Sequence, residues 1–203
     1  MRYAPDHNQT TRNRILAAAS RLFQEHGIAA VGLAKIMAEA DLTVGTFYTH
    51  FKSKEALLRE TLHGALQSRH AELEQALCGG DLEVVIRAYL SPEHRDAPGI
   101  GCPTAALASE LARHPRATRQ TFASHTEPSL DALAAGLSTR QGKRVGRADA
   151  AAFLGLLVGT LQLARATPDR AASDAILEAG VRAALRLAHP DDDRPSPGKA
   201  RGR

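Results

Sequence analysis

Two short helical segments, 33–40 and 43–50, constrain the fold of this chain more than any other part of it. Asp41 separates them, and aspartate tolerates the left-handed backbone conformation of a turn better than most residues do. Thr43 is a suitable N-cap for the second segment. Helices of this length are not stable alone. The pattern therefore predicts that the two segments pack on each other and on the longer amphipathic helix expected at 10–26.

The composition agrees with a helical chain. Of the 203 residues, 38 are alanine, the best helix former and a residue depleted from strands, and only eight are aromatic (five Phe, three Tyr, no Trp). A β-sandwich or barrel is thereby excluded. Strong apolar periodicity, with 24% charged residues, also argues against a disordered chain. We expect an all-α protein.

Glycine, proline and helical spacing of apolar residues divide the remaining chain into elements. The predicted helices are 53–78, 81–90, 104–114, 115–137, 147–166 and 169–188, with a Pro/Gly loop at 91–103. We expect three regions: a DNA-binding domain at 1–52, a domain for effector binding and dimerisation at 53–189, and a disordered tail at 190–203.

The segment 43–50 has one face suited to a protein core and one suited to DNA. Phe47 and Phe51, four residues apart, can face the core, and two short helices across a tight turn form a helix-turn-helix whose second helix fits the major groove. Tyr48, His50 and Lys54 suit phosphate contacts, and a glycine in this helix lets the backbone approach DNA closely. The predicted DNA-binding residues are Thr43, Val44, Gly45, Thr46, Tyr48, His50 and Lys54, of which Val44 suits a thymine methyl group.

The stretches RILAAASRLFQEHG, IMAEADLT and GTFYTHFKSKEALL resemble the TetR family of transcriptional regulators over about residues 12–62. This chain has Val31 and Gly32 where the family usually has Ser or Thr, and Asp41 where it usually has Gly. The resemblance implies an all-α protomer of nine helices. Its three N-terminal helices would bind double-stranded DNA, and the remainder would bind an effector and form a homodimer through the last two helices.

The last two helices also point to dimerisation on their own residues. The segment 147–166 is apolar almost all round and carries Gly155 and Gly159, which would let a partner helix approach closely. The predicted dimerisation residues are Phe153, Leu157, Gly159, Leu161, Ile176, Gly180 and Leu187. Two-fold symmetry of such a dimer implies a palindromic operator. The alternative is that these helices pack only within the protomer.

An effector pocket is expected between the middle helices of the second domain. The candidate lining residues are His63, Tyr89, Cys102, Phe122, His125 and Phe153, each of which has an alternative as an ordinary core or surface residue. Cys102 lies in the segment GIGCPTAALASEL, at the start of a helix, where a thiolate is stabilised. A GCP segment here resembles a subgroup of TetR-like repressors that includes sensors of electrophiles or oxidants. The alternative is that Cys102 is a small packing residue.

The sequence therefore predicts a repressor that leaves a palindromic operator when it meets a small-molecule or thiol-reactive effector. A regulator without an effector and a cysteine-dependent enzyme are the alternatives. The net charge of +4 is only weakly basic. We expect no cofactor, and no metal site because no pair of the nine histidines has convincing ligand spacing with a carboxylate or cysteine partner. We expect no membrane contact, because no uninterrupted apolar run approaches about 20 residues. Two cysteines do not make a disulfide framework, so we expect a soluble cytoplasmic protein.

Overall fold

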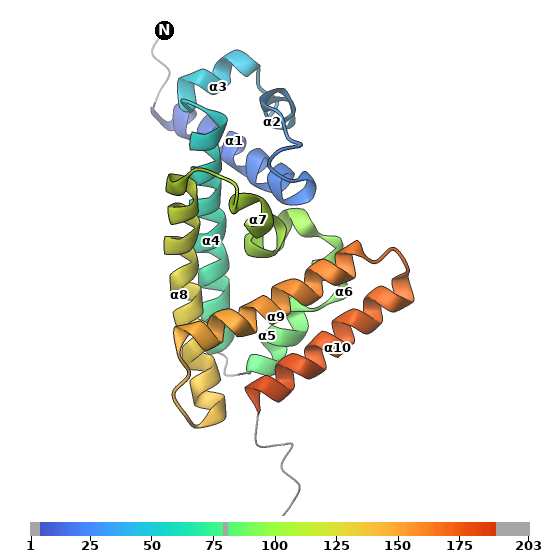
Figure 1. The fold of residues 1–203 in the computed structure, drawn as a ribbon. Helices are drawn as coiled ribbons and strands as arrows, with labels where there is room; N and C mark the ends of the chain where they lie inside the picture. Colours follow the sequence, from blue (N-terminus) through green and yellow to red (C-terminus); the bar gives the residue numbers. More distant parts are fainter. Residues whose placement is uncertain (1–4, 79–80, 190–203) are drawn as a thin grey trace, which may run out of the picture. The chain divides into compact units, whose positions relative to one another are not determined.

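The computed structural model describes residues 5–78 and 81–189, and within them every regular element is helical (Figure 1). The elements are α1 (Pro5–His26), α2 (Leu33–Glu39), α3 (Val44–His50), α4 (Lys54–Cys78), α5 (Leu82–Tyr89), α6 (Pro92–Asp96), the 3-10 turn η1 (Pro98–Ile100), α7 (Pro103–Leu111), α8 (Arg116–Gln141), α9 (Arg147–Ala166) and α10 (Arg170–Ala188). The predicted all-α class is confirmed. The predicted tail at 190–203 lies outside the described residues.

Nine of the α-helices correspond to the nine that were predicted. The additional helix, α6, has five residues and lies with η1 in the segment predicted as a Pro/Gly loop. Both begin at a proline, whose fixed φ suits the first position of a helix and whose missing N–H costs nothing there. Short turns of this kind are too brief to produce a readable apolar period.

The chain divides into two compact units. The first comprises residues 1–75 and 92–129, and the second comprises 76–91 and 130–203. The predicted DNA-binding segment 1–52 lies wholly in the first unit, and its boundary at residue 52 stays a prediction.

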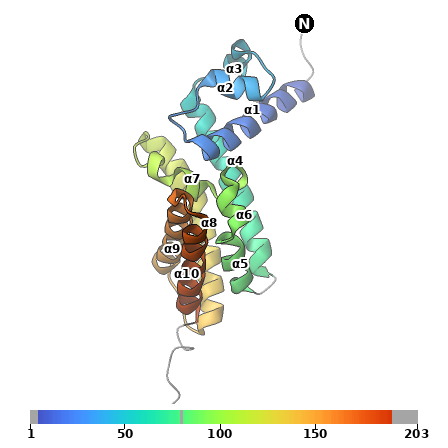
Figure 2. The ribbon, with the colours of Figure 1, turned by 90° about the vertical axis from the view of Figure 1, so that its right-hand side faces the viewer.

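The core of the first unit joins the three N-terminal helices to α4 and α7. Phe23, Ile36 and Phe47 are fully buried, and Leu107 and Leu111 of α7 belong to the same cluster. Figure 2 shows α1, α2 and α3 grouped beside the first turns of α4. The short helices are thus held by a shared core, as their length requires.

The second unit is built on the packing of α9 against α10, which run side by side (Figure 1). Gly180 of α10 is buried at this contact, and a Cβ placed on it would overlap Cγ2 of Thr160 and lie 2.8 Å from its Oγ1. The Ser173 hydroxyl donates to the carbonyl oxygen of Ala164 at 2.7 Å. Glycine at position 180 therefore sets how closely the two helices approach.

Candidate nucleic-acid interface

The turn between α2 and α3 has the geometry that Asp41 was predicted to adopt. Asp41 has a φ of 49°, the left-handed region, and its carboxylate accepts a hydrogen bond from Arg14 at 3.1 Å. The backbone N–H of Leu42 donates back to the carbonyl of Met37 at 2.8 Å. This bond closes the C-terminus of α2 in the manner of a Schellman motif. The turn therefore fixes the direction in which α3 leaves.

Aromatic side chains fix the rotation of α3 about its own axis. Phe47 is fully buried and stacks on Phe51, with ring centres 5.7 Å apart and planes 27° apart. The guanidinium of Arg12 lies 4.5 Å from the centre of the Phe51 ring and pairs with Glu60 at 2.5 Å. Phe47 and Phe51 are thus buried, as their spacing predicted. The Arg12 guanidinium covers the ring of Phe51.

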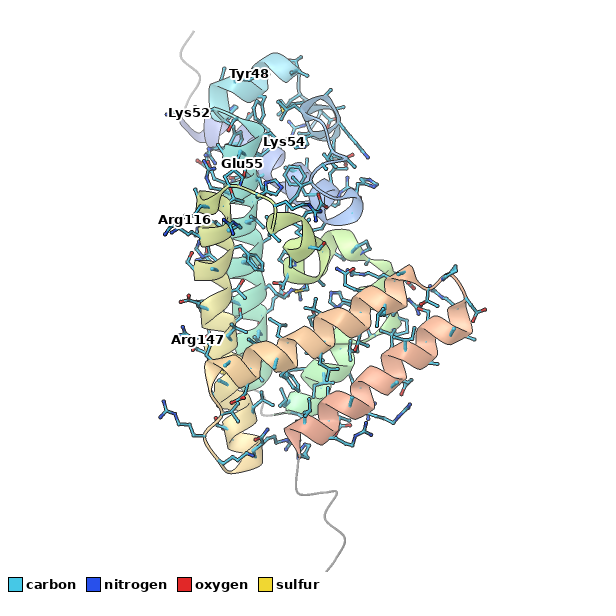
Figure 3. All side chains as sticks on the ribbon, in the orientation of Figure 1. Tyr48, Lys52, Lys54, Glu55, Arg116 and Arg147 are labelled. Atoms are coloured by element: carbon cyan, nitrogen blue, oxygen red, sulfur yellow. The ribbon has the colours of Figure 1, made fainter. Side chains whose placement is uncertain are left out.

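The opposite face of α3 is open to solvent. Tyr48 is 65% exposed and Val44 is 42% exposed, and Thr43 and Gly45 are also exposed. A Cβ on Gly45 would meet only Thr43 Oγ1, at 3.9 Å, so nothing in the chain's own packing requires glycine there. Figure 3 shows Tyr48 at the outer end of the first unit, on α3. A large exposed aromatic beside small and polar residues is a surface suited to a ligand.

Two predicted phosphate-binding residues have structural surroundings that the sequence did not reveal. The ammonium of Lys54 donates to the carbonyl oxygen of Ile28 at 2.5 Å and lies 5.7 Å from the centre of the Phe23 ring. Burial, together with the positive charge of Arg12, lowers the pKa of His50 below its ordinary value. His50 is therefore neutral at pH 7, and it offers an N–H donor rather than a charge to a phosphate.

Sequence reasoning missed Lys52, which is exposed in the link between α3 and α4 (Figure 3). It missed Thr49 too, an exposed residue of α3 whose hydroxyl donates to the carbonyl of Thr46 at 2.7 Å. Lys52 and Lys54 are two residues apart, and the sequence offers no sign of which one turns inward. In the structure Lys54 is the one turned inward, because its ammonium donates to the carbonyl oxygen of Ile28 and lies near the Phe23 ring.

A carboxylate of α7 holds the loop between α1 and α2. Glu110 accepts hydrogen bonds from the backbone N–H groups of Ile28 at 3.1 Å and Ala29 at 3.0 Å. Gly27 has a φ of 83°, and a Cβ on it would overlap the Glu110 carboxylate. Gly27 is thus required for two reasons, its backbone conformation and the close approach of Glu110.

A second carboxylate joins the start of α4 to the region where α7 ends and α8 begins. Glu55 accepts a hydrogen bond from the Thr118 hydroxyl at 2.5 Å and lies 3.2 Å from Nδ1 of His114. Burial alone would raise the pKa of Glu55, but these hydrogen bonds and the nearby positive charge outweigh it and lower the pKa. Glu55 is therefore ionised in the folded protein.

The residues predicted to line an effector pocket are divided between the units. His63, Cys102, Phe122 and His125 belong to the first unit, whereas Tyr89 and Phe153 belong to the second. Within the first unit, His63 contacts His125, and Phe122 packs against the apolar core. Cys102 is buried at the N-cap of α7, and its backbone N–H donates to Nε2 of His94 at 2.9 Å.

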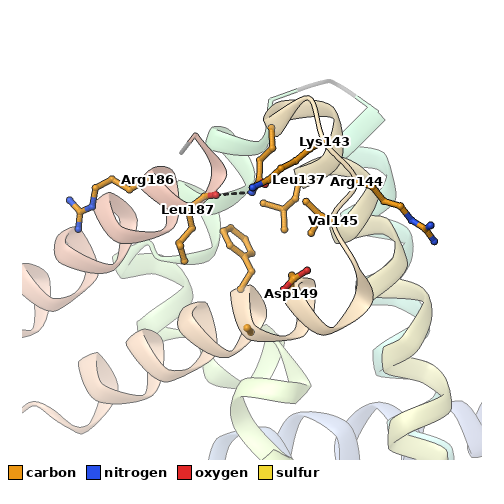
Figure 4. A pocket seen from close by; sticks show the side chains of 10 residues that line it. Leu137, Lys143, Arg144, Val145, Asp149, Arg186 and Leu187 are labelled. Atoms are coloured by element: carbon orange, nitrogen blue, oxygen red, sulfur yellow. Dashed lines mark hydrogen bonds between the residues drawn. The ribbon is translucent and has the colours of Figure 1, made fainter. Parts of the chain in front are cut away.

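Of these candidates, Phe153 lines a groove of about 520 Å³ in the second unit (Figure 4). The groove lies between the end of α8, the start of α9 and the end of α10. Gln141 closes part of it by donating to the carbonyl oxygen of Leu187 at 2.8 Å. Its lining combines apolar residues with three basic residues and one acidic residue: Leu137, Val145, Phe153 and Leu187, with Lys143, Arg144, Arg186 and Asp149.

Four of the predicted dimerisation residues face the interior of the second unit. Phe153, Leu157, Leu161 and Gly180 are buried within the protomer itself, so their assignment to a surface between protomers is corrected. A helix that is apolar all round has two candidate faces, and its sequence does not say which one faces inward. The remaining three residues, Gly159, Ile176 and Leu187, are accessible, and Leu187 is 54% exposed.

By length and average composition, α9 is apolar enough to cross a membrane. The prediction of no membrane contact was based on uninterrupted apolar runs, whereas this helix meets the criterion only by its average composition. One such helix is weak evidence for a membrane span, because core helices of soluble proteins meet the same criterion. Here α9 packs along α10 through its buried face.

Comparisons with known proteins place this helix-turn-helix in a family. Residues 15–61 match the family described as bacterial regulatory proteins, tetR family. The chain is 32% identical over 88 residues to the uncharacterized HTH-type transcriptional regulator YerO of Bacillus subtilis, covering 42% of this chain and 30% of that protein. It is 39% identical over 85 residues to the HTH-type transcriptional regulator AcrR of Shigella flexneri, covering 40% and 39%. The chain thus spans well under two thirds of these relatives.

Solved structures extend the likeness of fold to most of the chain. The reduced form of Escherichia coli NemR superposes with a TM-score of 0.71 at 22% identity, over 87% of this chain and 96% of that one. A TetR-family regulator from Agrobacterium tumefaciens has a TM-score of 0.69 at 26% identity, over 87% and 98%.

The chain thus contains a helix-turn-helix and shares its fold with these solved structures. The family match covers residues 15–61, which lie within the segment whose sequence resembles the TetR family.

Proposed function

We propose that this protein is a DNA-binding transcriptional regulator, a cytoplasmic repressor that binds a palindromic operator as a homodimer. The observation that carries the proposal is the division of α3 into two faces. Phe47 is fully buried, and the next residue, Tyr48, is 65% exposed. A helix held this firmly from inside, with a polar and aromatic face outside, can enter the major groove without a change of its own structure.

We assign DNA contacts to the exposed face of α3 and to the link that follows it. Val44 contacts a thymine methyl group, and Gly45 allows the backbone close to the duplex. The Tyr48 hydroxyl and the Lys52 ammonium bind phosphates. Thr43 and Thr46, whose hydroxyl oxygens lie 3.1 Å apart, offer further donors beside them. His50 and Lys54 contribute mainly by holding this surface in place.

We propose that the homodimer forms through the accessible faces of α9 and α10. The accessible residues on these faces are Gly155 and Gly159 of α9, with Ile176 and Leu187 of α10. Leu163 of α9 is also 64% exposed. A Cβ on either glycine meets nothing within 4 Å in the protomer. Small residues facing open space on an apolar helix suit the close approach of a second copy.

We propose that release from DNA follows binding of a small molecule or modification of Cys102 by an electrophile or oxidant. Cys102 is the N-cap of α7, the helix whose Glu110 holds the loop between α1 and α2. A modified thiol no longer fits its buried position, and a shift of α7 would loosen that loop. An effector must prefer the conformation that does not bind DNA, since only such a preference shifts the population.

Two alternatives to this proposal can be distinguished from it. A regulator without an effector would bind its operator equally well after treatment with quinone or peroxide. A cysteine-dependent enzyme would need a base for the Cys102 thiol. The imidazole of His94 instead accepts the backbone N–H of Cys102. We therefore favour a regulator over an enzyme, and the response to quinone or peroxide distinguishes the two kinds of regulator.

Binding to a palindromic site selected in vitro tests the main proposal, with fluorescence anisotropy as the readout. Tyr48→Ala should weaken binding at least tenfold, and Val84→Ala, a matched change of an exposed apolar residue on α5, should leave it unchanged. Equal affinity of Tyr48→Ala and the wild type would reject α3 as the recognition helix. For the thiol, Cys102→Ser should abolish release by quinone, and a wild-type response in that variant would reject the sensor.

A further inference from the structure

In the first unit, His63 of α4 and His125 of α8 face each other. Nδ1 of His63 lies 2.8 Å from Nε2 of His125, the ring centres are 4.4 Å apart, and the ring planes are inclined at 65°. His63 is exposed, and His125 is half-buried. The function proposed above places neither residue in the DNA-facing surface of α3 or at Cys102.

The geometry of the pair is close to that of two imidazole ligands on one metal ion. Zinc binds histidine nitrogen at about 2.0–2.1 Å, so two adjacent ligand nitrogens of one ion lie roughly 2.9–3.4 Å apart. The observed 2.8 Å falls within a few tenths of an ångström of that range. Turning the rings about χ2, a broad and soft torsion, would direct both nitrogens at one ion.

We propose that His63 and His125 form a two-histidine site for a divalent transition-metal ion, which bridges α4 and α8. Imidazole nitrogen suits Zn²⁺, Ni²⁺ and Cu²⁺, whereas Mg²⁺ and Ca²⁺ prefer oxygen ligands. Among these ions Cu²⁺ binds most tightly, following the general order of affinity for divalent metals.

Binding at this site conserves protons. When both imidazoles are neutral, the hydrogen bond of the metal-free pair places one hydrogen between Nδ1 of His63 and Nε2 of His125. The ion takes the place of that hydrogen, which moves to the other nitrogen of its own ring. Both rings are then neutral ligands with their remaining N–H groups directed away from the ion, and no net proton is released.

The site leaves coordination positions open. Among the residues that the structure describes, no group of three or more His, Cys, Asp and Glu side chains gathers at one point. Two imidazoles therefore supply all the protein ligands, and water fills the remaining positions on the exposed side of His63. An ion held in this way exchanges with solution and is available to further ligands.

A bound ion would tie α4 to the part of α8 that belongs to the same unit as the DNA-facing surface. Helix α4 begins at Lys54, four residues after α3 ends at His50, and His63 lies in its third turn. The ion would thus join α8 to the helix that follows the recognition helix.

Isothermal titration of the untagged full-length protein, freed of metal, with Cu²⁺ and Ni²⁺ tests the site. We expect one ion per chain, and at least tenfold weaker binding in both His63→Ala and His125→Ala. His70→Ala is the matched control on α4. It lies seven residues from His63, about 10 Å along the helix, and so cannot share the ion. Binding in either pair variant equal to that of the wild type would overturn the proposal.

Electron paramagnetic resonance of the wild-type Cu²⁺ complex provides a test that does not depend on the folding of variants. The expected spectrum shows hyperfine splitting from two imidazole nitrogens. A spectrum with one nitrogen or none would place the ion elsewhere and overturn the two-histidine site. The DNA-binding proposal is unaffected by either result, because its own readout is operator affinity in metal-free buffer.

Discussion

Substitution of two glycines of the second unit tests packing inside the protomer and packing between protomers separately. Gly180 is buried against Thr160, whereas Gly159 on α9 faces open space. Changing each to alanine adds the same methyl group to the interior of a helix. If α9 meets a second copy through its accessible face, Gly180→Ala should weaken the fold and Gly159→Ala should weaken the dimer.

The structure sets the expected magnitudes. Alanine is more favourable than glycine in a helix interior by about 1 kcal/mol. At position 180 the new Cβ would also lie 2.8 Å from Oγ1 and 3.0 Å from Cβ of Thr160, a β-branched side chain with little freedom to move. Overpacking of this kind costs about 1–3 kcal/mol, so we expect a net loss of roughly 0–2 kcal/mol in unfolding free energy.

At position 159 the helix-propensity gain is not opposed within the protomer. A partner helix in close contact would meet the new methyl group, and the same overpacking cost of about 1–3 kcal/mol would raise the dimer dissociation constant roughly 5- to 150-fold. Sedimentation equilibrium measures that constant, and urea unfolding at a fixed protein concentration measures stability.

A compensating change isolates the contact at Gly180. Thr160→Ala removes Cγ2 and Oγ1, the two atoms nearest to the new Cβ, so the double variant Gly180→Ala/Thr160→Ala should show a favourable coupling energy. Dimerisation of Gly159→Ala indistinguishable from that of the wild type would refute the placement of this helix face between protomers. Equal stability of Gly180→Ala and the wild type, without coupling to Thr160, would refute the packing argument.

Four further predictions concern the first unit. Lys52→Ala should lower the slope of log affinity against log salt by about 0.9, the value for one phosphate contact, and Lys54→Ala should instead lower the unfolding temperature. Phe47→Ala should cost about 3–5 kcal/mol of unfolding free energy, measured by urea titration. Because the pKa of Glu55 is lowered in the fold, the stability it contributes is present above its unfolded pKa of about 4.3 and is lost as the pH falls through the folded value. The melting temperatures of Glu55→Gln and the wild type should therefore differ at pH 7 and converge on acidification. Gly27→Ala should destabilise the protein by at least 1 kcal/mol, because alanine is strained at a φ of 83° and would displace Glu110. An unchanged salt slope, an unchanged stability or a constant difference with pH would contradict the corresponding assignment.

The sequence was sufficient for the helix-turn-helix because its local signals are strong and agree with one another. Asp41 takes the predicted left-handed conformation, and Phe47 and Phe51 are buried as their spacing indicated. Such signals arise within a few residues, where side-chain chemistry and backbone geometry act together.

Contacts between distant segments could not be predicted in the same way. Phe153 and Leu157 have the spacing of an interface but fill the interior of their own unit, since periodicity defines a face without naming its partner. The pairing of His63 with His125 joins residues 62 positions apart. Nothing local in either helix marks it.

The hydrogen bonds of Glu110 to the loop after α1 affect how a hybrid regulator should be designed. The N-terminal 52 residues depend on a carboxylate from α7 for two backbone N–H groups, and on Leu107 and Leu111 for part of their core. Exchanged alone into another scaffold, this segment would leave those amides and that apolar surface exposed to water. A chimera that is meant to keep the DNA specificity of this protein should carry α7 with it, although some fifty residues of sequence lie between them.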